Sequence, residues 1–481
     1  MQMLPQTQMT QSAPQRREIE RQRLFPAGAG SLRARPGVLP RVAMPWLLWP
    51  LLVYLAAVLI IGKGPTYFGY PPFYWGEAVL FAATIWVLSS RSLRMAGKRG
   101  ITGLSVTVAL YIGLGTVITV LSFYRWPVLD VLRDAATWYY AALFFVGLAI
   151  GKRPNLAQRV WSLLGRFWAL ALIWGLANFL SGDRLSQLGP MMAGREYPLF
   201  SNSGSELAEN VALGAFLVIA NLVRSPFRWL RVALQVTAFA GLAAVSATEG
   251  RGFKVGIGLA LLATVALCFG RGRLAKLQTR LPAVIVIAVL ALSAYATISE
   301  EALARITHAD RFGEISLDQR SGTSWWRVLW WQRLAETVMA QNPLFGLGFG
   351  QSLGVYNPYL LGDDQTKWPV RSPHNFNMTV FVRMGIVGSA VWVLILVLGP
   401  AVLFVRLWKN GFRGHRYRGD RKDELLFWLI MLVASWGNAS FGVLLEGPVL
   451  AIPFWFALGF AMARSVDPSG FVSPVPLRCA S

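Results

Sequence analysis

Long apolar segments, separated by shorter polar ones, recur along the chain from Trp46 to Ala463. Many of them approach the ~20 residues that a helix needs to cross the hydrocarbon core of a bilayer. Backbone N–H and C=O groups in lipid must find their partners within the segment, so each apolar run is expected to be a helix. The pattern predicts an all-α, polytopic membrane protein with about 12 transmembrane helices. The predicted spans are residues 44–61, 72–90, 101–122, 135–151, 160–180, 206–223, 229–248, 253–270, 281–299, 376–405, 424–442 and 448–464.

Basic residues are concentrated in alternate loops between these spans. Loops rich in Lys and Arg stay on the cytoplasmic side of a membrane. Both termini are therefore predicted to be cytoplasmic, and residues 300–375, between the ninth and tenth spans, become the largest extracytoplasmic loop. The basic clusters begin at Arg91, Lys152, Arg224, Arg271 and Arg406.

Part of this large outer loop has the pattern of a helix. No Gly or Pro occurs from Ser324 to Asn342, and four tryptophans lie in the first half of that segment. Because tryptophan favours the membrane–water interface, we expect a helix lying on the outer leaflet. An anchor without a further function is the alternative. Apolar residues at helical spacing are Val328, Trp331, Ala335 and Val338.

The composition agrees with a membrane protein: 55% of the residues are hydrophobic and only 14% are charged, against about 25% charged in a typical soluble domain. The net charge of +23 would also suit a nucleic-acid-binding protein. However, the basic residues lie mostly in short loops between apolar runs, which is the positive-inside pattern. Membrane lipids are therefore expected partners, and nucleic acid is not.

The two ends of the chain differ from its middle. Residues 1–43 are rich in Gln, Pro and Arg and are predicted to form a disordered, basic cytoplasmic arm, too long and too polar for a cleaved signal peptide. Residues 44–299 then hold the first nine spans and residues 376–464 the last three. Residues 465–481 are predicted to be a cytoplasmic tail.

His374 is one of three histidines in the chain and lies where the outer loop meets the tenth span. Ser372 and Pro373 suit an N-cap and a first helical position, so His374 and Asn375 are expected in the first turn of that helix. The helix dipole disfavours a second positive charge there, which lowers the pKa of the imidazole and keeps it neutral, as a general base requires. An ordinary histidine at the interface is the alternative.

Arginines on the same side are candidates for binding an anion. Arg327 lies one helical turn before Trp331, and its guanidinium fork suits a phosphate or diphosphate. Snorkelling to lipid headgroups is the alternative. Arg195 lies in a second outer loop, and Arg251 ends an outer hairpin, where pairing with Glu249 is the alternative.

Other kinds of chemistry find little support in the residues. The outer loops contain no His/Asp/Glu cluster with metal spacing and no Gly-rich phosphate loop. The only two cysteines, Cys268 and Cys479, offer neither a redox pair nor a disulfide framework. We therefore expect no metal and no cofactor.

Four motifs together resemble the O-antigen ligase/polymerase superfamily of bacterial membrane glycosyltransferases. Their order matches that family, as does the large outer loop between the ninth and tenth of twelve spans. The resemblance covers residues 190–400, although Glu249-Gly250-Arg251 departs from the Ser-Arg pair that the family often has. The motifs are Arg327-x-x-x-Trp331, Asn342-Pro343-Leu344-Phe345-Gly346-Leu347-Gly348-Phe349-Gly350, Ser372-Pro373-His374-Asn375 and Arg383-Met384-Gly385-Ile386-Val387-Gly388.

The resemblance implies a GT-C-like helical fold in the bacterial inner membrane with a periplasmic active site. It implies metal-independent transfer, with inversion, of a glycan from undecaprenyl diphosphate to a glycan or to lipid A–core. His374 would be the general base and Arg327 a catalytic residue, and the diphosphate would be bound by Arg327, Arg195, Arg251 and Asn375. These motifs do not separate ligase from polymerase. A polysaccharide or lipid-linked glycan transporter or flippase is the alternative from another class, and it would require accessible charge near the midplane of the membrane.

Overall fold

The computed structural model describes residues 44–70, 73–89, 102–182, 184–190, 199–200, 204–220, 222, 227–246, 256–260, 262–264, 267, 325–356, 371–413, 420–440, 442 and 444–466. Several predictions fall outside these residues: the N-terminal arm, the ninth span at 281–299, most of the C-terminal tail, and both Arg195 and Arg251.

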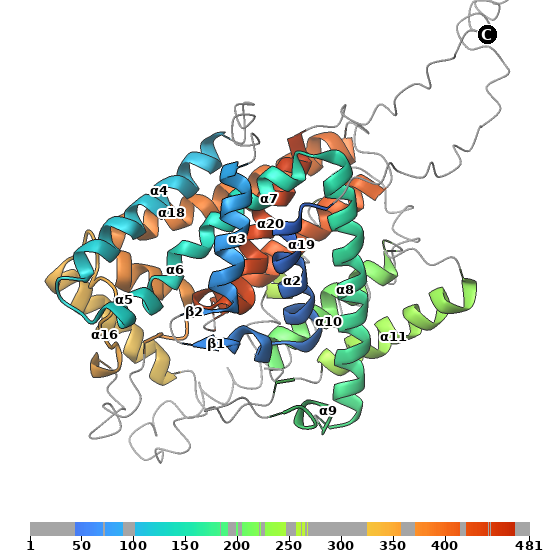
Figure 1. Ribbon diagram of the computed structural model, residues 1–481, viewed down its shortest axis with the longest axis horizontal. Coiled ribbons are helices and arrows are strands. Elements are labelled where there is room, and N and C mark those ends of the chain that lie inside the picture. The colour runs from blue at the N-terminus through green and yellow to red at the C-terminus, as the bar shows by residue number, and fades with distance from the viewer. Residues whose placement is uncertain are drawn as a thin grey trace, which may run out of the picture. The chain divides into compact units, whose positions relative to one another are not determined.

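The described chain is almost entirely helical (Figure 1), which confirms an all-α membrane protein. Strands β1 (Gly69–Tyr70) and β2 (Phe73–Tyr74) form a short antiparallel hairpin, with Gly69 opposite Tyr74. The α-helices are α2 (Trp49–Ile61), α3 (Trp75–Ser89), α4 (Thr102–Ser122), α5 (Val128–Asp134), α6 (Ala136–Tyr139), α7 (Leu143–Gly151), α8 (Pro154–Leu180), α9 (Arg184–Gln187), α10 (Gly204–Ile219), α11 (Arg228–Ser246), α16 (Trp325–Gln341), α18 (Phe376–Arg406), α19 (Asp420–Ala439) and α20 (Pro448–Val466). Short helical turns are η1 (Trp46–Leu48), η2 (Gly64–Tyr67), η4 (Tyr140–Ala142), η6 (Gly354–Tyr356) and η8 (Leu444–Glu446), and the π-helical turn η7 (Leu407–Arg413) follows α18.

Five helical segments of the described residues are long and apolar enough to cross a membrane. Shorter apolar helices correspond to further predicted spans, such as α2 and α3. The total of about twelve spans and the arrangement of the loops stay predictions. The five segments are Gly103–Ser122, Val128–Gly151, Pro154–Leu180, Phe376–Gly411 and Pro448–Val466.

Helix α20 lies at the centre of the helix packing. In the apolar stretch of α20, 89% of the residues are buried, against 28% in the apolar stretch of α18. Its closest partner is α7, where glycines allow the backbones to touch: a Cβ at Gly459 would lie 1.9 Å from Phe144 O, and one at Gly147 would lie 2.1 Å from Phe456 O. Small residues at such contacts are how membrane helices gain close packing.

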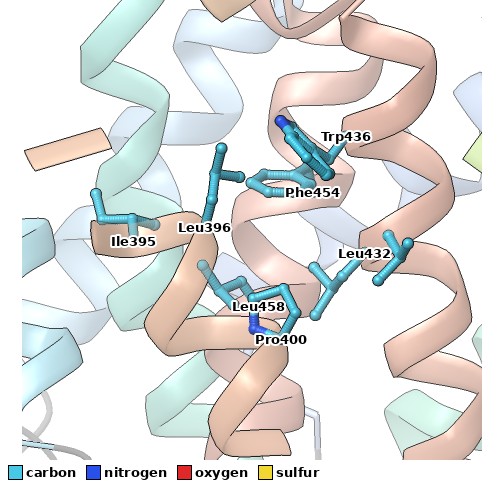
Figure 2. Close-up of a pocket in the computed structure, with 8 residues that line it drawn as sticks. Ile395, Leu396, Pro400, Leu432, Trp436, Phe454 and Leu458 are labelled. Atoms are coloured by element: carbon cyan, nitrogen blue, oxygen red, sulfur yellow. The ribbon is translucent and has the colours of Figure 1, made fainter. Parts of the chain in front are cut away.

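A small void lies where α18, α19 and α20 meet, near Pro400 in the interior of α18 (Figure 2). It measures about 10 Å³ and is lined by Ile395, Leu396, Pro400, Leu432, Val433, Trp436, Phe454 and Leu458. This volume holds at most one water, and apolar cavities of that kind stay dry. The void is therefore a packing defect beside a helix-interior proline rather than a substrate site.

Helix α16 occupies the stretch of the outer loop that the sequence predicted as helical. Its buried face is formed by Trp330, Leu334 and Val338, which pack with Leu353 and with Val382 of α18. The expected face contained Trp331 and Ala335, and these side chains are only partly buried. Val338 is buried as predicted, whereas Trp330 and Leu334 take the buried positions expected for Trp331 and Ala335, on the face that packs against α18.

Helix α18 is broken at Gly385, which has a non-helical conformation with φ +63°. A Cβ at this position would lie 2.4 Å from the carbonyl carbon of Leu344. The loop from Asn342 to Gly350 inserts here: Ile386 N donates to Pro343 O at 2.9 Å, and Val387 N donates to Leu344 O at 3.1 Å. Loop and helix therefore exchange backbone hydrogen bonds at this break.

Candidate functional site

His374 lies outside helix α18, in a loop conformation that L-residues seldom adopt. Its φ is +56°, the only positive value at a non-glycine residue in the described part of the chain. The expected capping was wrong: α18 begins at Phe376, and Asn375 is the N-cap, accepting a hydrogen bond from Met378 N at 3.2 Å. The left-handed region costs an L-residue about 1–2 kcal/mol, so surrounding contacts must hold His374 there.

Two contacts fix the backbone on either side of His374. Its own N–H donates to Ser372 Oγ at 3.1 Å. The indole N–H of Trp331, on α16, donates to Pro373 O at 2.6 Å. Ser372 is thus a support for the His374 backbone, instead of the helix cap that the sequence suggested.

The side chain of Arg327 is half-buried on α16, one helical turn before Trp331. Residues four apart share a helix face, so Arg327 lies on the face that reaches the His374 loop. Burial, together with the positive charge of Arg327, lowers the pKa of His374 from 6.5 to about 4. The predicted neutral imidazole is confirmed, but burial and Arg327 are the causes, not a position inside the first turn of α18.

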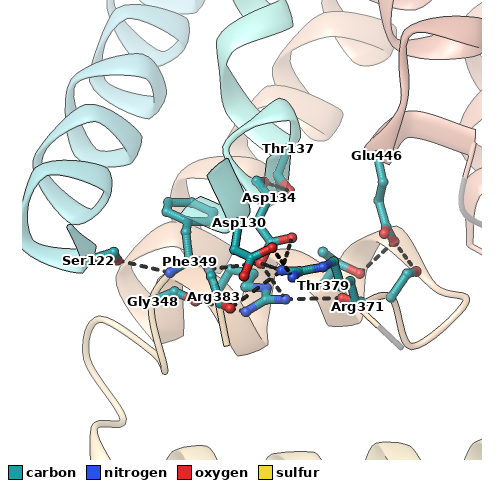
Figure 3. A network of polar contacts seen from close by, with 12 residues as sticks. Ser122, Asp130, Asp134, Thr137, Gly348, Phe349, Arg371, Thr379, Arg383 and Glu446 are labelled. Carbon is teal, nitrogen blue, oxygen red and sulfur yellow. Dashed lines mark hydrogen bonds and ion pairs between the residues drawn. The ribbon is translucent and has the colours of Figure 1, made fainter. Parts of the chain in front are cut away.

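Glu446 lies beside this loop, contributed by the short turn η8 before α20. Its Oε1 accepts hydrogen bonds from Ser372 Oγ at 2.7 Å and from Thr379 Oγ1 at 2.6 Å (Figure 3). Burial raises the pKa of Glu446 from 4.5 to about 7, although these two hydrogen bonds and Arg383 act in the opposite direction. A carboxyl group that titrates near neutral pH therefore lies two hydrogen bonds from the backbone of His374.

A network of charges, buried except at Asp130, fixes the start of the same loop (Figure 3). Arg371 pairs with Asp130, and its Nη1 lies 3.3 Å from Asp134 Oδ1. Arg383, 1% exposed, places its Nη2 2.8 Å from Asp134 Oδ2. Arg383 also donates to the carbonyls of Gly348 at 3.1 Å and of Arg371 at 3.2 Å. The network joins α5, the loop from Asn342 to Gly350 and α18 around the segment that carries His374.

Arg383 therefore ties α18 to Asp134 and to the segments of Gly348 and Arg371. Glu209 is another intramembrane charge: its carboxylate accepts hydrogen bonds from Ser435 and from Asn438, which tie α10 to α19. Both charged side chains are nearly fully buried. Arg383 is thus compensated by an ion pair and Glu209 by hydrogen bonds, and removing such a partner would leave a buried polar group unsatisfied.

The expected diphosphate ligands are only partly brought together. Arg327 lies near His374, and Asn375 is adjacent to it but uses its side-chain oxygen as the helix cap. Arg195 and Arg251 lie outside the described residues. Within the described ranges, no group of three or more His, Cys, Asp or Glu residues could hold a metal ion.

An apolar groove of about 780 Å³ lies between α3, α4 and the α6–η4 region. Trp138 and Tyr139 line it, and they follow Asp134 of the charge network by about one helical turn. The one carboxylate in its lining, Glu77, accepts hydrogen bonds from Tyr139 and Tyr140. The other lining residues are Phe68, Gly69, Phe73, Tyr74, Trp75, Ala78, Leu80, Phe81, Thr84, Ile112 and Ala142.

Sequence reasoning missed Glu446, Asp130 and Asp134 and gave Arg371 no role. One signal was present: acidic residues are scarce, 23 against 46 basic ones, and these three lie at the outer ends of apolar runs. A scarce carboxylate placed there has to find a partner or accept a large cost of burial. The partners themselves are more than 60 residues away in the chain.

Comparison with known proteins bears on the segment that carries most of these residues. A search of curated protein sequences finds no match to the chain. Residues 236–393 match the family model described as O-antigen ligase. The match includes Arg327, His374 and Arg383, whereas their partners Asp134 and Glu446 lie beyond its ends. This segment is therefore similar to an O-antigen ligase domain, and the match supports the O-antigen ligase superfamily for this multi-pass membrane protein.

Proposed function

We propose that the protein is a glycosyltransferase that moves a glycan from undecaprenyl diphosphate to a sugar hydroxyl, in the biosynthesis of a surface polysaccharide. The observation that carries this proposal is the pair of His374 and Arg327: an imidazole kept neutral by burial, within the electrostatic reach of a guanidinium. The first can accept a proton and the second can bind a phosphate.

The reaction follows from these two roles. The acceptor hydroxyl attacks the anomeric carbon from the side opposite the diphosphate, so configuration inverts. The new C–O bond forms as the bond to the diphosphate oxygen breaks, and the hydroxyl proton passes to His374. Arg327 stabilises the charge that develops on the leaving diphosphate, as fixed cationic donors do in many transfer reactions. Arg195 and Arg251 are proposed to bind the same group.

A pKa of about 4 makes His374 a weak base in the protein without substrate. Binding of the anionic diphosphate beside Arg327 changes this, because its negative charge offsets the positive charge that disfavours imidazolium. The pKa of His374 then rises toward the range in which a general base is effective. Donor binding would thus activate the base.

The apolar groove supports the lipid part of the proposal. Its lining is aromatic and aliphatic, which suits a polyprenyl chain. Its position one helical turn from Asp134 places it near the network around the His374 loop. We propose that the tail of the donor lies in this groove.

In the topology predicted from the basic loops, the segment that carries His374 is extracytoplasmic, so we propose an inner-membrane protein with cytoplasmic termini and a periplasmic site. A transporter or flippase is less well supported, because the buried intramembrane charges Arg383 and Glu209 are engaged in helix-to-helix contacts.

The decisive experiment uses purified protein with His374→Ala. We expect loss of glycan transfer with donor binding retained, and normal turnover would refute the assignment of the base. Surface polysaccharide from a deletion strain separates the two subclasses. A single repeat left on the core indicates a polymerase, and polymer accumulating on the lipid carrier indicates a ligase.

A further inference from the structure

A chain of two hydrogen bonds connects Glu446 to the backbone of His374. Glu446 Oε1 accepts from Ser372 Oγ at 2.7 Å, and Ser372 Oγ in turn accepts from His374 N at 3.1 Å. A serine hydroxyl has one proton and two acceptor lone pairs. Since its proton is directed to Glu446, its lone pairs are left to face the N–H of His374.

The same carboxylate also holds the first turn of α18. Thr379 Oγ1 lies 2.6 Å from Glu446 Oε1 and 3.1 Å from Asn375 O. Glu446 therefore contacts both the residue two before His374 and the helix that begins two residues after it. The turn η8 that carries Glu446 directly precedes α20, the most completely buried of the candidate membrane spans.

His374 needs such support, because its φ of +56° is unfavourable for an L-residue. Strained backbone persists only where the surroundings over-determine it. Without the Ser372 hydroxyl held as an acceptor, the His374 N–H would lose its partner, and the residue could relax to a negative φ. That rotation would carry the imidazole away from Arg327.

We propose that Glu446 is a positioning residue for His374, acting through Ser372 to hold the left-handed backbone that aims the imidazole toward Arg327. The inference rests on the proposed function insofar as His374 is taken to accept the proton. What the arrangement requires of Glu446 is an oxygen that accepts two hydrogen bonds. The amide oxygen of glutamine meets that requirement, so the role does not need a negative charge.

Kinetic measurements on the purified full-length protein test this role. Glu446→Ala and Ser372→Ala are expected to lower kcat at least tenfold with KM for the lipid-linked donor changed less than threefold. Glu446→Gln should keep at least half of kcat and the pH profile of the natural protein. Ser435→Ala is the matched control, because it removes another buried Ser–Glu hydrogen bond away from the site, and it should leave kcat unchanged.

A second measurement reports the position of His374 without relying on transfer activity. Replacing His308 and His415 with Gln leaves His374 as the only histidine, and its rate of acylation by diethyl pyrocarbonate can then be followed. We expect Glu446→Ala and Ser372→Ala to raise this rate at least threefold and Glu446→Gln to leave it unchanged.

The two measurements separate the possible failures. Unchanged acylation in both alanine variants would overturn the positioning role, as would a Glu446→Gln variant as impaired as Glu446→Ala. Faster acylation with normal kcat would support the positioning role and refute His374 as the base, and so the proposed function. If Glu446→Ala does not fold, Ser372→Ala and Glu446→Gln give the same decision.

Discussion

Leu347 N donates a hydrogen bond to Val382 O at 2.7 Å, the carbonyl that Ile386 N would bond in an unbroken α-helix. A backbone N–H of the outer loop thus replaces a backbone N–H of the membrane span as the donor to Val382 O. The exchange is possible because Gly385 leaves the helical conformation at that point.

Gly385→Ala should therefore be strongly destabilising. The added Cβ would meet the Leu344 carbonyl at 2.4 Å in a backbone with φ +63°, so loop and helix would have to separate. We expect a loss of more than about 2 kcal/mol in the free energy of unfolding, measured by thermal unfolding in detergent. Gly113→Ala in α4, where a Cβ meets nothing within 4 Å, is the control and should be neutral or stabilising by up to about 1 kcal/mol.

Asp134→Asn should also be costly, because it leaves the buried guanidinium of Arg383 without its ion-pair partner. Breaking one side of a buried pair costs about 3–5 kcal/mol. A double-mutant cycle with Arg383→Met measures the coupling. Additive effects of the two changes would contradict the pairing seen in the structure.

Substitutions of Arg327 should affect both donor binding and His374. Arg327→Lys and Arg327→Ala are both expected to raise KM for the donor, since lysine lacks the bidentate fork. Arg327→Ala should in addition raise the pKa of His374 above about 4, because it removes a positive charge, but burial should keep it below 6.5. Titration of the His374 imidazole by NMR would detect this, and unchanged KM in both variants would refute the diphosphate role.

The pH dependence of transfer should distinguish free from substrate-bound protein. The profile of kcat/KM reports the free protein, in which the pKa of His374 is about 4. The neutral base is then fully present at pH 6 and is lost only as the pH falls through about 4. The acid limb of kcat should lie at higher pH, because the bound diphosphate favours imidazolium. An acid limb of kcat at or below that of kcat/KM would contradict activation by the donor.

Filling the apolar groove should discriminate among donors by the length of their tails. Ala78 is exposed and lines the groove. The larger side chain of Ala78→Trp therefore fills part of the groove without disturbing the buried packing. We expect KM to rise at least fivefold for an undecaprenyl donor and less for a short-chain analogue. Val106→Trp, at a residue 52% exposed and outside the groove lining, is the control. Equal effects of Ala78→Trp on both donors would argue against a tail in the groove.

The sequence predicted the helices of this protein better than the faces that they bury. Apolar runs located α18 and α20 to within two residues of their ends, because spanning a bilayer imposes length and hydropathy directly. Hydropathy does not distinguish a side chain facing lipid from one facing another helix. Val106 and Leu110 of α4 are more than half exposed, whereas Trp330 and Leu334 of α16 are fully buried, and no pattern in the sequence separates these cases.

The sequence identified the residue of the candidate site that belongs to a rare type. It did not identify the features of the site that depend on contacts between distant segments. His374 stands out as one of three histidines. Its left-handed backbone depends on distant segments: Asp134 is 237 residues from its partner Arg371, and Glu446 is 74 residues from its partner Ser372. Local sequence rules predicted Ser372 as the helix cap. In the tertiary structure Ser372 instead accepts a hydrogen bond from the backbone N–H of His374.

The break at Gly385 has a consequence for local unfolding of this protein. Each backbone hydrogen bond that the loop from Asn342 to Gly350 makes to α18 substitutes for one that the helix would have made to itself. The loop cannot detach without leaving polar backbone groups unsatisfied beside the membrane. This part of the outer loop and the outer end of α18 therefore unfold together as one cooperative unit. The outer end of α18, which directly follows His374, is thus a rigid part of the structure.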